Sequence, residues 1–325
     1  MLKNKVLKIL LSNKSHISGQ YISECLGVSR TAVWKAISAL KKDGYIIESV
    51  NNKGYLLISK NDILNQVEIE QNISVYQNPP KIIYLDEVDS TNNYARSLSD
   101  TMNSDFLVVS DMQTLGKGRL GRIWDSPAGT GIFMSLCIKP NIATEKASMI
   151  TLVMAISLCD AIDELYSVNT SIKWPNDIVL NSKKISGILT EMSSDIDGIK
   201  YIISGVGINV NNREFSDNIK ETASSLFLET GILMDRSKLI ASIIHHFYNN
   251  FNIFLKTEDM TGLKEKYEKH LANIGKEVKI LDPKGEYNAL ALGIDETGAL
   301  LVNIDGKIKR IISGEVSVRG LYGYV

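Results

Sequence analysis

The sequence predicts an α+β protein in three parts, and three patterns support this prediction. Residues 1–62 combine three stretches with helical spacing of apolar residues and one hairpin signal. Residues 80–270 alternate between strand-like runs and longer helical stretches, which indicates a mixed α/β domain. Residues 271–325 hold only short strand-like runs between Gly/Asp turns, which is typical of a small β-barrel. We expect these ranges to be three domains, with a polar connection that ends in Pro79-Pro80.

The first part has the order of a winged helix-turn-helix. Helices are expected at about 3–11, 18–26 and 30–42, the last two behind a capping serine and each followed by a glycine. Two β-rich runs around the turn at 51–54 form the wing. In this arrangement the helix at 30–42 enters the major groove of DNA and the wing contacts the backbone.

Charge is divided unevenly along the chain. Residues 1–60 contain ten basic and three acidic residues, a net charge of +7, whereas the remainder carries −8. A basic module on an acidic body indicates nucleic-acid binding through one end of the protein. A solvated lysine-rich surface and a helical protein-interaction module are the alternatives. The residues predicted to contact DNA are Arg30, Thr31, Trp34, Lys35, Lys41, Lys42 and Lys53.

The second and third parts are read from their apolar runs. Central strands are expected at about 81–85, 106–110, 132–138, 172–174, 185–191 and 201–206, and helices at 147–166 and 236–256. Strands of the last part are expected at about 278–281, 289–294, 299–302, 307–312 and 315–319.

Composition excludes several classes of protein. With 325 residues, 44% of them hydrophobic and 22% charged, the chain is an ordinary globular protein and not a disordered one. Its three separated cysteines exclude a disulfide framework and a cysteine-rich zinc site, and the four histidines suggest no metal ligands. No apolar run approaches the roughly 20 residues that cross a bilayer, and lysines interrupt the N-terminal apolar stretch. We therefore expect a cytoplasmic protein without a membrane partner or a resident metal site.

The most informative stretch is the glycine-rich run from Gly116 to Gly131. Its first glycines match G-x-G-x-x-G, but Pro127 and further glycines follow where a dinucleotide-binding turn must open a helix. A mobile loop that wraps a ligand and carries basic residues as anion clamps explains both features. These residues are Lys117, Arg119 and Arg122. The alternative is an exposed hairpin with scattered basic residues.

Four further motifs are candidates for a site. They are Asp89-Ser90-Thr91-Asn92, Lys173-Trp174-Pro175-Asn176-Asp177, Lys184-Ile185-Ser186-Gly187-Ile188-Leu189 and Gly205-Val206-Gly207-Ile208-Asn209. Lysine, asparagine and aspartate together can hold a phosphate, a magnesium ion or a nucleophilic amine, and a glycine inside a strand can mark a closely approaching ligand. Each motif also has a structural interpretation, as turn formers, a strand bulge or a serine helix cap.

In their order along the chain, these motifs resemble the biotin protein ligases. The matching segments are DSTN, GKGRLGRIWDSP, KWPND, KISGIL and GVGINV. The basic winged-helix segment resembles that of the bifunctional members, which are also biotin-operon repressors. The closing ISGEVSVRG resembles their SH3-like C-terminal domain. One position departs, because the first basic residue of the loop motif is usually arginine and Lys117 loses its planar fork.

The resemblance implies a reaction in two steps. Biotin and ATP form biotinyl-5′-AMP and pyrophosphate with the help of Mg²⁺, and a lysine of a biotin carboxyl carrier protein then takes the biotinyl group. The implied catalytic residues are Lys184, Arg119, Asp177 and Lys173. The implied biotin-binding residues are Ser90, Thr91, Asn92, Gln113, Lys117, Gly118, Arg119, Lys184, Gly187, Leu189 and Gly205. Contacts to ATP and the adenylate are expected from Arg122, Trp124, Asn176 and Asn209.

The resemblance also implies a regulatory role. A single winged helix reads one half-site, so repression at operator DNA is expected from a homodimer. The adenylate would promote that dimer by ordering the glycine-rich loop. Two other readings stay open: a lipoate-type ligase with similar chemistry, and a ligand-responsive repressor without catalytic activity.

Overall fold

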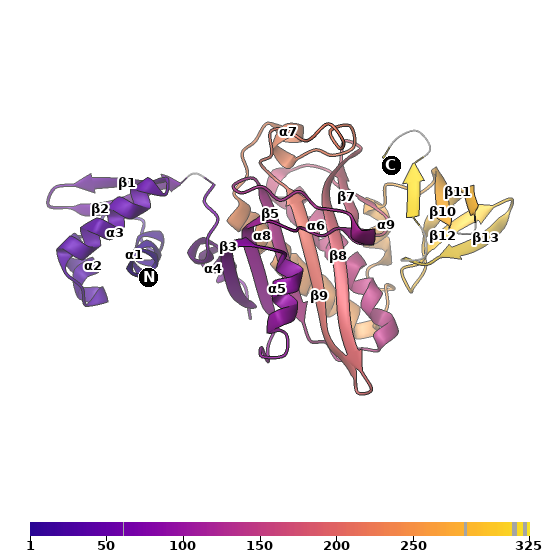
Figure 1. Ribbon diagram of the computed structural model, residues 1–325, viewed down its shortest axis with the longest axis horizontal. Coiled ribbons are helices and arrows are strands. Elements are labelled where there is room, and N and C mark those ends of the chain that lie inside the picture. Colours follow the sequence, from indigo (N-terminus) through magenta and orange to yellow (C-terminus); the bar gives the residue numbers. More distant parts are fainter. Residues whose placement is uncertain (61, 283–284, 314–316, 321–323) are drawn as a thin grey trace.

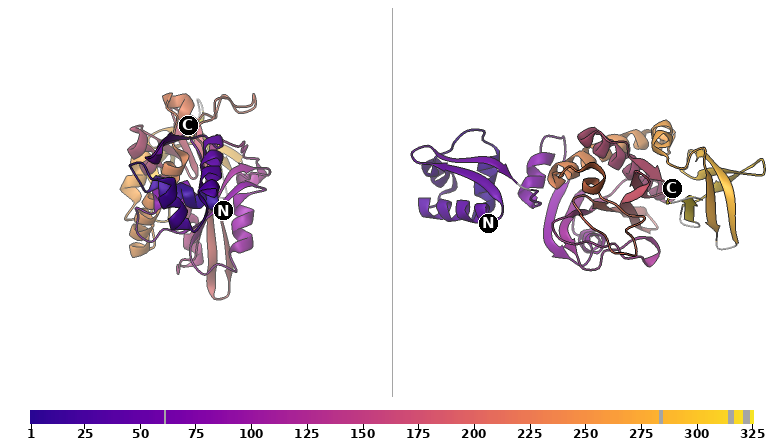
Figure 2. Two further views of the ribbon diagram at one scale, coloured as in Figure 1. Left: turned by 90° about the vertical axis from the view of Figure 1, so that its left-hand side faces the viewer. Right: turned by 90° about the horizontal axis from the view of Figure 1, so that it is seen from above.

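The computed structural model describes residues 1–60, 62–282, 285–313, 317–320 and 324–325. The three parts follow one another along the long axis of the molecule (Figure 1). The N-terminal module and the C-terminal sheet lie at opposite ends of the central part, as the view from above shows (Figure 2). Among the described residues, no helix is both long and apolar enough to cross a membrane.

The N-terminal module is the winged helix-turn-helix that the sequence predicts. Its elements are α1 (Leu2–Leu11), α2 (Gly19–Leu26), α3 (Arg30–Lys42), β1 (Tyr45–Val50) and β2 (Gly54–Lys60). The hydroxyls of Ser18 and Ser29 cap α2 and α3, accepting from the backbone N–H of Tyr21 and Ala32. The apolar faces of the three helices close a core of their own with the hairpin.

Helix α4 (Gln66–Ile73) lies in the segment expected to be only a polar connection. The Asn65 side chain caps it through the backbone N–H of Glu68. Val67 belongs to the core of the N-terminal module, whereas Ile69 and Ile73 belong to the core of the central part. Since its few apolar residues are divided between two cores, the helix joins the two parts.

The central part is a seven-stranded mixed sheet in the order β3-β4-β5-β9-β8-β7-β6. Only β3 and β4 pair in parallel. The strands are β3 (Lys81–Val88), β4 (Phe106–Gln113), β5 (Gly131–Ile138), β6 (Ser171–Lys173), β7 (Asp177–Leu180), β8 (Lys183–Asp195) and β9 (Gly198–Asn209). The helices are α5 (Thr91–Leu98), α6 (Ile150–Tyr166), α7 (Leu226–Thr230), α8 (Arg236–Thr257) and α9 (Lys264–His270), with 3₁₀ turns at Arg119–Gly121 and Thr144–Met149. Helices α6 and α8 share the large core on one face of the sheet, and α5 packs on the other.

The C-terminal part is an antiparallel sheet in the order β13-β12-β11-β10-β14. Its strands are β10 (Glu277–Asp282), β11 (Gly285–Ile294), β12 (Leu300–Ile304), β13 (Lys307–Ile311) and β14 (Ser317–Gly320). The expected small β domain is present, but its described strands do not close a barrel, because β13 and β14 are the edges of the sheet. Its inward residues, among them Val278, Ala291 and Val302, belong to the same core as the central helices. The expected last strand began at 315, and residues 315–316 lie outside the described ones.

Candidate active site

A cavity of about 460 Å³ lies over strands β8 and β9, beside the start of α5 and the glycine-rich segment. Thirteen residues expected at a ligand site line it: Ser90, Thr91, Asn92, Gln113, Lys117, Gly118, Arg119, Trp124, Asn176, Lys184, Gly187, Leu189 and Gly205. Ile188, Val206 and Gly207 also line it; they were not assigned to the site from the sequence, although all three lie within motifs already singled out. The structure thus brings these residues together, and their binding roles stay predictions.

One end of the cavity is a fixed network of amides and hydroxyls. The Gln113 Oε1 accepts from the backbone N–H and the hydroxyl of Thr91 at 2.9 and 3.2 Å, and its Nε2 donates to Ser126 Oγ at 3.0 Å. The buried Ser135 hydroxyl lies 2.8 Å from Thr91 Oγ1 and 2.6 Å from Asn92 Oδ1. Because these partners lock the side chains, this end can offer hydrogen bonds at fixed positions.

Ser90 resolves one of the open alternatives. It stands at the N-cap position of α5, but its side chain makes no capping hydrogen bond. It is buried and lines the cavity instead. Because its hydroxyl is not used as a helix cap, Ser90 can form a hydrogen bond with a ligand in the cavity.

The strand glycines make room for protein side chains rather than directly for a ligand. A Cβ on Gly205 would lie 2.1 Å from Asn92 Oδ1, and one on Gly207 would lie 2.5 Å from the indole of Trp124. Any larger residue would displace Asn92 or the tryptophan wall. Close approach to these glycines was expected from a ligand. In the structure, the side chains of Asn92 and Trp124 are the groups that lie against them.

Basic side chains also line the cavity. Lys117 Nζ donates to Asn93 Oδ1 at 2.9 Å, and Arg119 Nη1 donates to Asn176 Oδ1 at 2.7 Å. Burial lowers the pKa of the Arg119 guanidinium from its ordinary value, and the Asp177 carboxylate opposes that shift. Together with Lys184, these two residues give the cavity three basic side chains, an arrangement that suits an anion.

The glycine-rich segment folds back on itself. The Trp124 N–H donates to the Gly116 carbonyl at 2.9 Å, and the Gly118 N–H donates to the Arg122 carbonyl at 2.7 Å. A short 3₁₀ turn spans Arg119–Gly121, and no α-helix follows, in agreement with the exclusion of a dinucleotide-binding turn. The hydrogen bond from Arg119 to Asn176 ties this segment to the turn between β6 and β7.

A β-bulge orients Lys184. In the pairing of β7 with β8, Ile178 lies opposite Ser186 and Val179 opposite Lys184, so Ile185 is an extra residue. Side chains alternate along a regular strand, and one extra residue shifts the alternation. Lys184 and Gly187, three positions apart, therefore both line the cavity, whereas Ser186, two positions on from Lys184, does not.

Four predicted residues lie outside the cavity wall: Lys173, Asp177, Arg122 and Asn209. Asp177 stands behind Lys184, with Oδ1 2.7 Å from Lys184 Nζ. The Asn209 amide donates to the Ser224 carbonyl at 3.0 Å, and Arg122 is exposed on the loop. Lys173 is buried, with Nζ 3.4 Å from the ring centroid of Tyr324, a residue that no sequence pattern pointed to.

A second cavity of about 810 Å³ adjoins the first. The two share Arg119, Asn176, Ile188 and Leu189 in their walls. Glu145 and Glu191 also line the second cavity. Glu191 is paired with Arg96 at 2.6 Å, so an entering cation would meet chiefly the carboxylate of Glu145 on its way to the first cavity.

The predicted DNA-contacting residues Arg30, Thr31, Trp34, Lys35, Lys41, Lys42 and Lys53 are all exposed. Elsewhere, His245 stacks on Tyr76 with ring centroids 4.1 Å apart, and His246 Nε2 lies 2.9 Å from Glu164, so both pack in α8 as expected. Within the described ranges, no group of three metal-ligating side chains comes together.

Comparisons with known proteins agree with this division. Residues 84–209 match the biotin/lipoate A/B protein ligase family, residues 3–56 a helix-turn-helix domain and residues 274–319 the biotin protein ligase C-terminal domain. The chain is 39% identical to the bifunctional ligase/repressor BirA of Bacillus subtilis, over 93% of this chain and 94% of that protein. It is 30% identical to BirA of Escherichia coli, over 95% of both.

Solved structures lead to the same family. The fold is similar to that of the biotin protein ligase from Aquifex aeolicus in complex with biotin and ATP, with a TM-score of 0.65 and 34% identity. That similarity covers 74% of this chain and 99% of the other. The chain belongs to the biotin protein ligase family, and it carries the helix-turn-helix domain of the bifunctional ligase/repressors.

Proposed function

We propose that this protein is an ATP-dependent biotin protein ligase that is also a repressor of biotin genes responsive to biotinyl-AMP. One observation carries the catalytic part: a fixed amide and hydroxyl network at Gln113 and Thr91 and the cations of Lys117, Arg119 and Lys184 line one cavity. Biotin has the matching two ends, a ureido ring that needs hydrogen-bond partners and a carboxylate that needs a cation. The names of the relatives support the same assignment.

In the first step, a biotin carboxylate oxygen attacks the α-phosphorus of ATP. The new P–O bond gives biotinyl-5′-AMP, and the bond to pyrophosphate breaks. Two anions must meet in this step, and negative charge grows on the phosphoryl oxygens. The ammonium of Lys184 and the guanidinium of Arg119 are held before the substrates arrive, so they can stabilise that charge with little reorganisation.

The residues do not support a resident Mg²⁺ site. Among the described residues, the wall of the first cavity contains no carboxylate, and Asp177 is already paired with Lys184. Magnesium prefers carboxylate and phosphate oxygens. We therefore assign Mg²⁺ to the phosphates of ATP and derive no protein ligand for it.

In the second step, a lysine amine of a biotin carboxyl carrier protein attacks the mixed anhydride, and AMP leaves. We assign the approach of this lysine to the second cavity, because the carboxylate of Glu145 in its wall complements the charge of the lysine. Asp177 lines neither cavity, which supports a role in orienting Lys184 rather than in deprotonating the incoming amine.

The regulatory part rests on the N-terminal module. An exposed basic recognition helix on an acidic body supports binding to operator DNA, and the need for two half-sites supports a homodimer when adenylate is bound. Both activities belong to the cytoplasm.

The test measures pyrophosphate release from the protein with ATP and either biotin or lipoate, followed by labelling of a carrier domain. Release with biotin and transfer to one carrier lysine support the proposal. Release only with lipoate would assign the chain to lipoate chemistry, and release with neither acid would leave a repressor without catalysis. Operator titrations with the apo protein and with biotin plus ATP test the second activity, and equal affinities would contradict ligand-gated repression.

A further inference from the structure

Tyr324, near the end of the chain, contacts two charged residues of the hairpin formed by β6 and β7. Its hydroxyl donates to Asp177 Oδ2 at 2.5 Å, and the Nζ of Lys173 lies 3.4 Å from its ring centroid. Lys173 and Asp177 are directly opposite each other in the strand pairing. A single tyrosine side chain therefore spans this cross-strand pair and holds both members.

Asp177 extends these contacts to the cavity. Its other carboxylate oxygen lies 2.7 Å from Lys184 Nζ, and the two side chains are 15% and 26% exposed. At this depth an ion pair is screened less than at the surface. Lys184 lines the cavity, whereas Asp177 and Tyr324 do not, so Tyr324 can influence the reacting groups through Asp177.

The β6–β7 hairpin also contacts the C-terminal part of the chain. Trp174 Nε1 donates to the Gly298 carbonyl at 3.0 Å, and the backbone N–H of Ala272 donates to the Ile172 carbonyl at 2.9 Å. These neutral contacts attach the two parts to each other. The contact from Tyr324 differs from them because it reaches a carboxylate that is paired with a cavity lysine.

We propose that Tyr324 is a positioning residue for formation of the acyl-adenylate, and this inference rests on the proposed ligase function. Its hydroxyl fixes Asp177 in the orientation in which the carboxylate directs the Lys184 ammonium toward the cavity. The cation of Lys173 over its face holds the ring in place. Without the hydroxyl, Asp177 can rotate, and Lys184 loses the fixed position from which it stabilises the growing charge.

The first experiment compares Tyr324→Phe with Tyr287→Phe in the full chain. Tyr287 is a matched control, because its hydroxyl accepts from Lys309 at 2.7 Å and the same ammonium lies 4.6 Å from its ring centroid, within the C-terminal sheet. Direct loss of a preorganised donor slows catalysis by about 10²–10³, so an indirect contact is expected to lower kcat for pyrophosphate release by about 10-fold. The KM for biotin should stay within about twofold of wild type, since Tyr324 does not line the cavity. Tyr287→Phe should change neither constant, and wild-type kcat in Tyr324→Phe would overturn the proposal.

A double-mutant cycle then asks whether Tyr324 acts through Asp177. In an Asp177→Asn background, the further change Tyr324→Phe is expected to lower kcat by less than about twofold, because both changes break one chain of contacts. A further loss as large as that in wild type would show that Tyr324 acts independently of Asp177 and would overturn the proposal.

A measurement without substrates separates this proposal from the proposed function. In the ligand-free protein, hydrogen exchange of the backbone amides at 173–178 should be faster in Tyr324→Phe than in wild type and unchanged in Tyr287→Phe. Absence of biotin-dependent pyrophosphate release from the wild-type protein would reject the ligase function. Unchanged exchange in Tyr324→Phe would reject the positioning role whatever the wild-type activity.

Discussion

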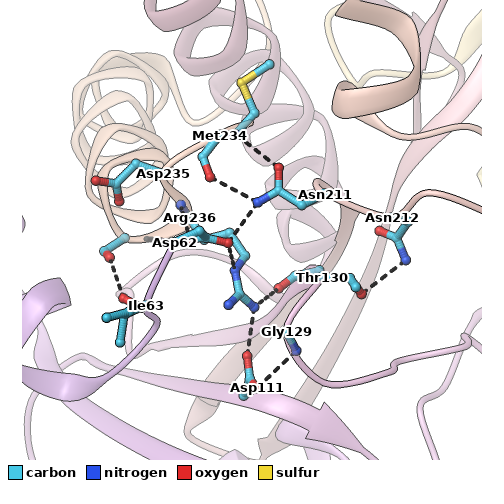
Figure 3. Close-up of polar contacts among 12 residues, drawn as sticks. Asp62, Ile63, Asp111, Gly129, Thr130, Asn211, Asn212, Met234, Asp235 and Arg236 are labelled. Atoms are coloured by element: carbon cyan, nitrogen blue, oxygen red, sulfur yellow. Dashed lines mark hydrogen bonds and ion pairs between the residues drawn. The ribbon is translucent and has the colours of Figure 1, made fainter. Parts of the chain in front are cut away.

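Asp62 meets Arg236 at 2.5 Å, from the segment that follows the wing to the first turn of α8 (Figure 3). The two side chains are 8% and 2% exposed. Arg236 Nη1 also lies 2.7 Å from Asp111 on β4 and donates to the Gly131 carbonyl at 3.0 Å. One buried guanidinium therefore binds the connection to the DNA-binding module and the central sheet at once.

The glycine-rich segment and strand β9, which both contribute to the cavity wall, end beside Asp62 and Arg236. The Asn211 amide donates to Asp62 Oδ2 at 2.7 Å (Figure 3). The Asn211 backbone N–H donates to the Thr130 carbonyl at 2.7 Å. The Gly129 N–H donates to Asp111 Oδ2 at 3.0 Å. The connection, the end of the glycine-rich segment and the end of β9 thus share one polar cluster.

Asp62→Ala should destabilise the protein strongly. Arg236 keeps the carboxylate of Asp111 in this variant, but buried N–H donors of Arg236 and Asn211 lose their acceptor. We therefore expect a loss of about 3 kcal/mol in the free energy of unfolding, measured in urea. Asp43→Ala is the matched control, because Asp43 pairs with Lys3 at 2.6 Å but both side chains are more than a third exposed. The control should cost less than about 1 kcal/mol. Equal losses in the two variants would contradict the buried role of Asp62.

Lys184→Ala should reduce adenylate formation by about 10²–10³, since it removes a preorganised charge from the cavity. The measurement is biotin-dependent pyrophosphate release, with folding checked by circular dichroism. Lys183→Ala removes the neighbouring lysine, which does not line the cavity, and should keep wild-type activity. Near-normal release from folded Lys184→Ala would remove this lysine from the catalytic residues.

Arg119→Gly should slow adenylate formation without abolishing it, and its main effect should be faster release of the adenylate. The guanidinium ties the glycine-rich segment to Asn176, and its loss should open that closure. Free biotinyl-AMP should then appear in solution and label amines at random. Arg122→Gly changes an exposed arginine of the same loop outside the cavity, and its adenylate should dissociate at the wild-type rate. An unchanged dissociation rate in Arg119→Gly would show that this contact does not retain the ligand.

Lys35→Ala should weaken binding to operator DNA and reduce its dependence on salt. Each lost phosphate contact lowers the slope of log affinity against log salt by about one. Lys5 is an exposed lysine on α1, outside the recognition helix, so Lys5→Ala should leave the slope unchanged. Titrations at several salt concentrations give both slopes, and equal slopes for wild type and Lys35→Ala would exclude a phosphate contact there.

The sequence predicted elements best where one apolar pattern served one core. The apolar runs of the central strands are such cases. The capping serines Ser18 and Ser29 were also predicted correctly, because a helix cap depends only on neighbouring residues. Helix α4 was not predicted, because Val67 and Ile69 belong to different cores and no single apolar periodicity describes both. The last part is the expected small β domain, but its described strands do not close a barrel, because strand spacing alone does not determine whether the two edge strands pair.

The motifs in the sequence identified most residues that line the cavity, but they did not predict how these residues are arranged in space. Ser90 and Lys184 are distant in the sequence and meet only because the sheet brings α5 and β8 together. The position of Asp177 behind Lys184 and the contact from Tyr324 depend on tertiary packing. No local pattern marks a residue whose partners come from another part of the chain.

The extra residue at Ile185 makes the direction of Lys184 a matter of chain length as well as of residue type. A deletion of one residue there would keep every motif letter that matters to the chemistry, yet it would turn the ammonium toward the apolar core, where a charge cannot stay unpaired. This stretch should therefore tolerate replacement better than any change in its number of residues. Among related chains, insertions and deletions should be selected against between Asp177 and Gly187 even where the amino acids themselves vary.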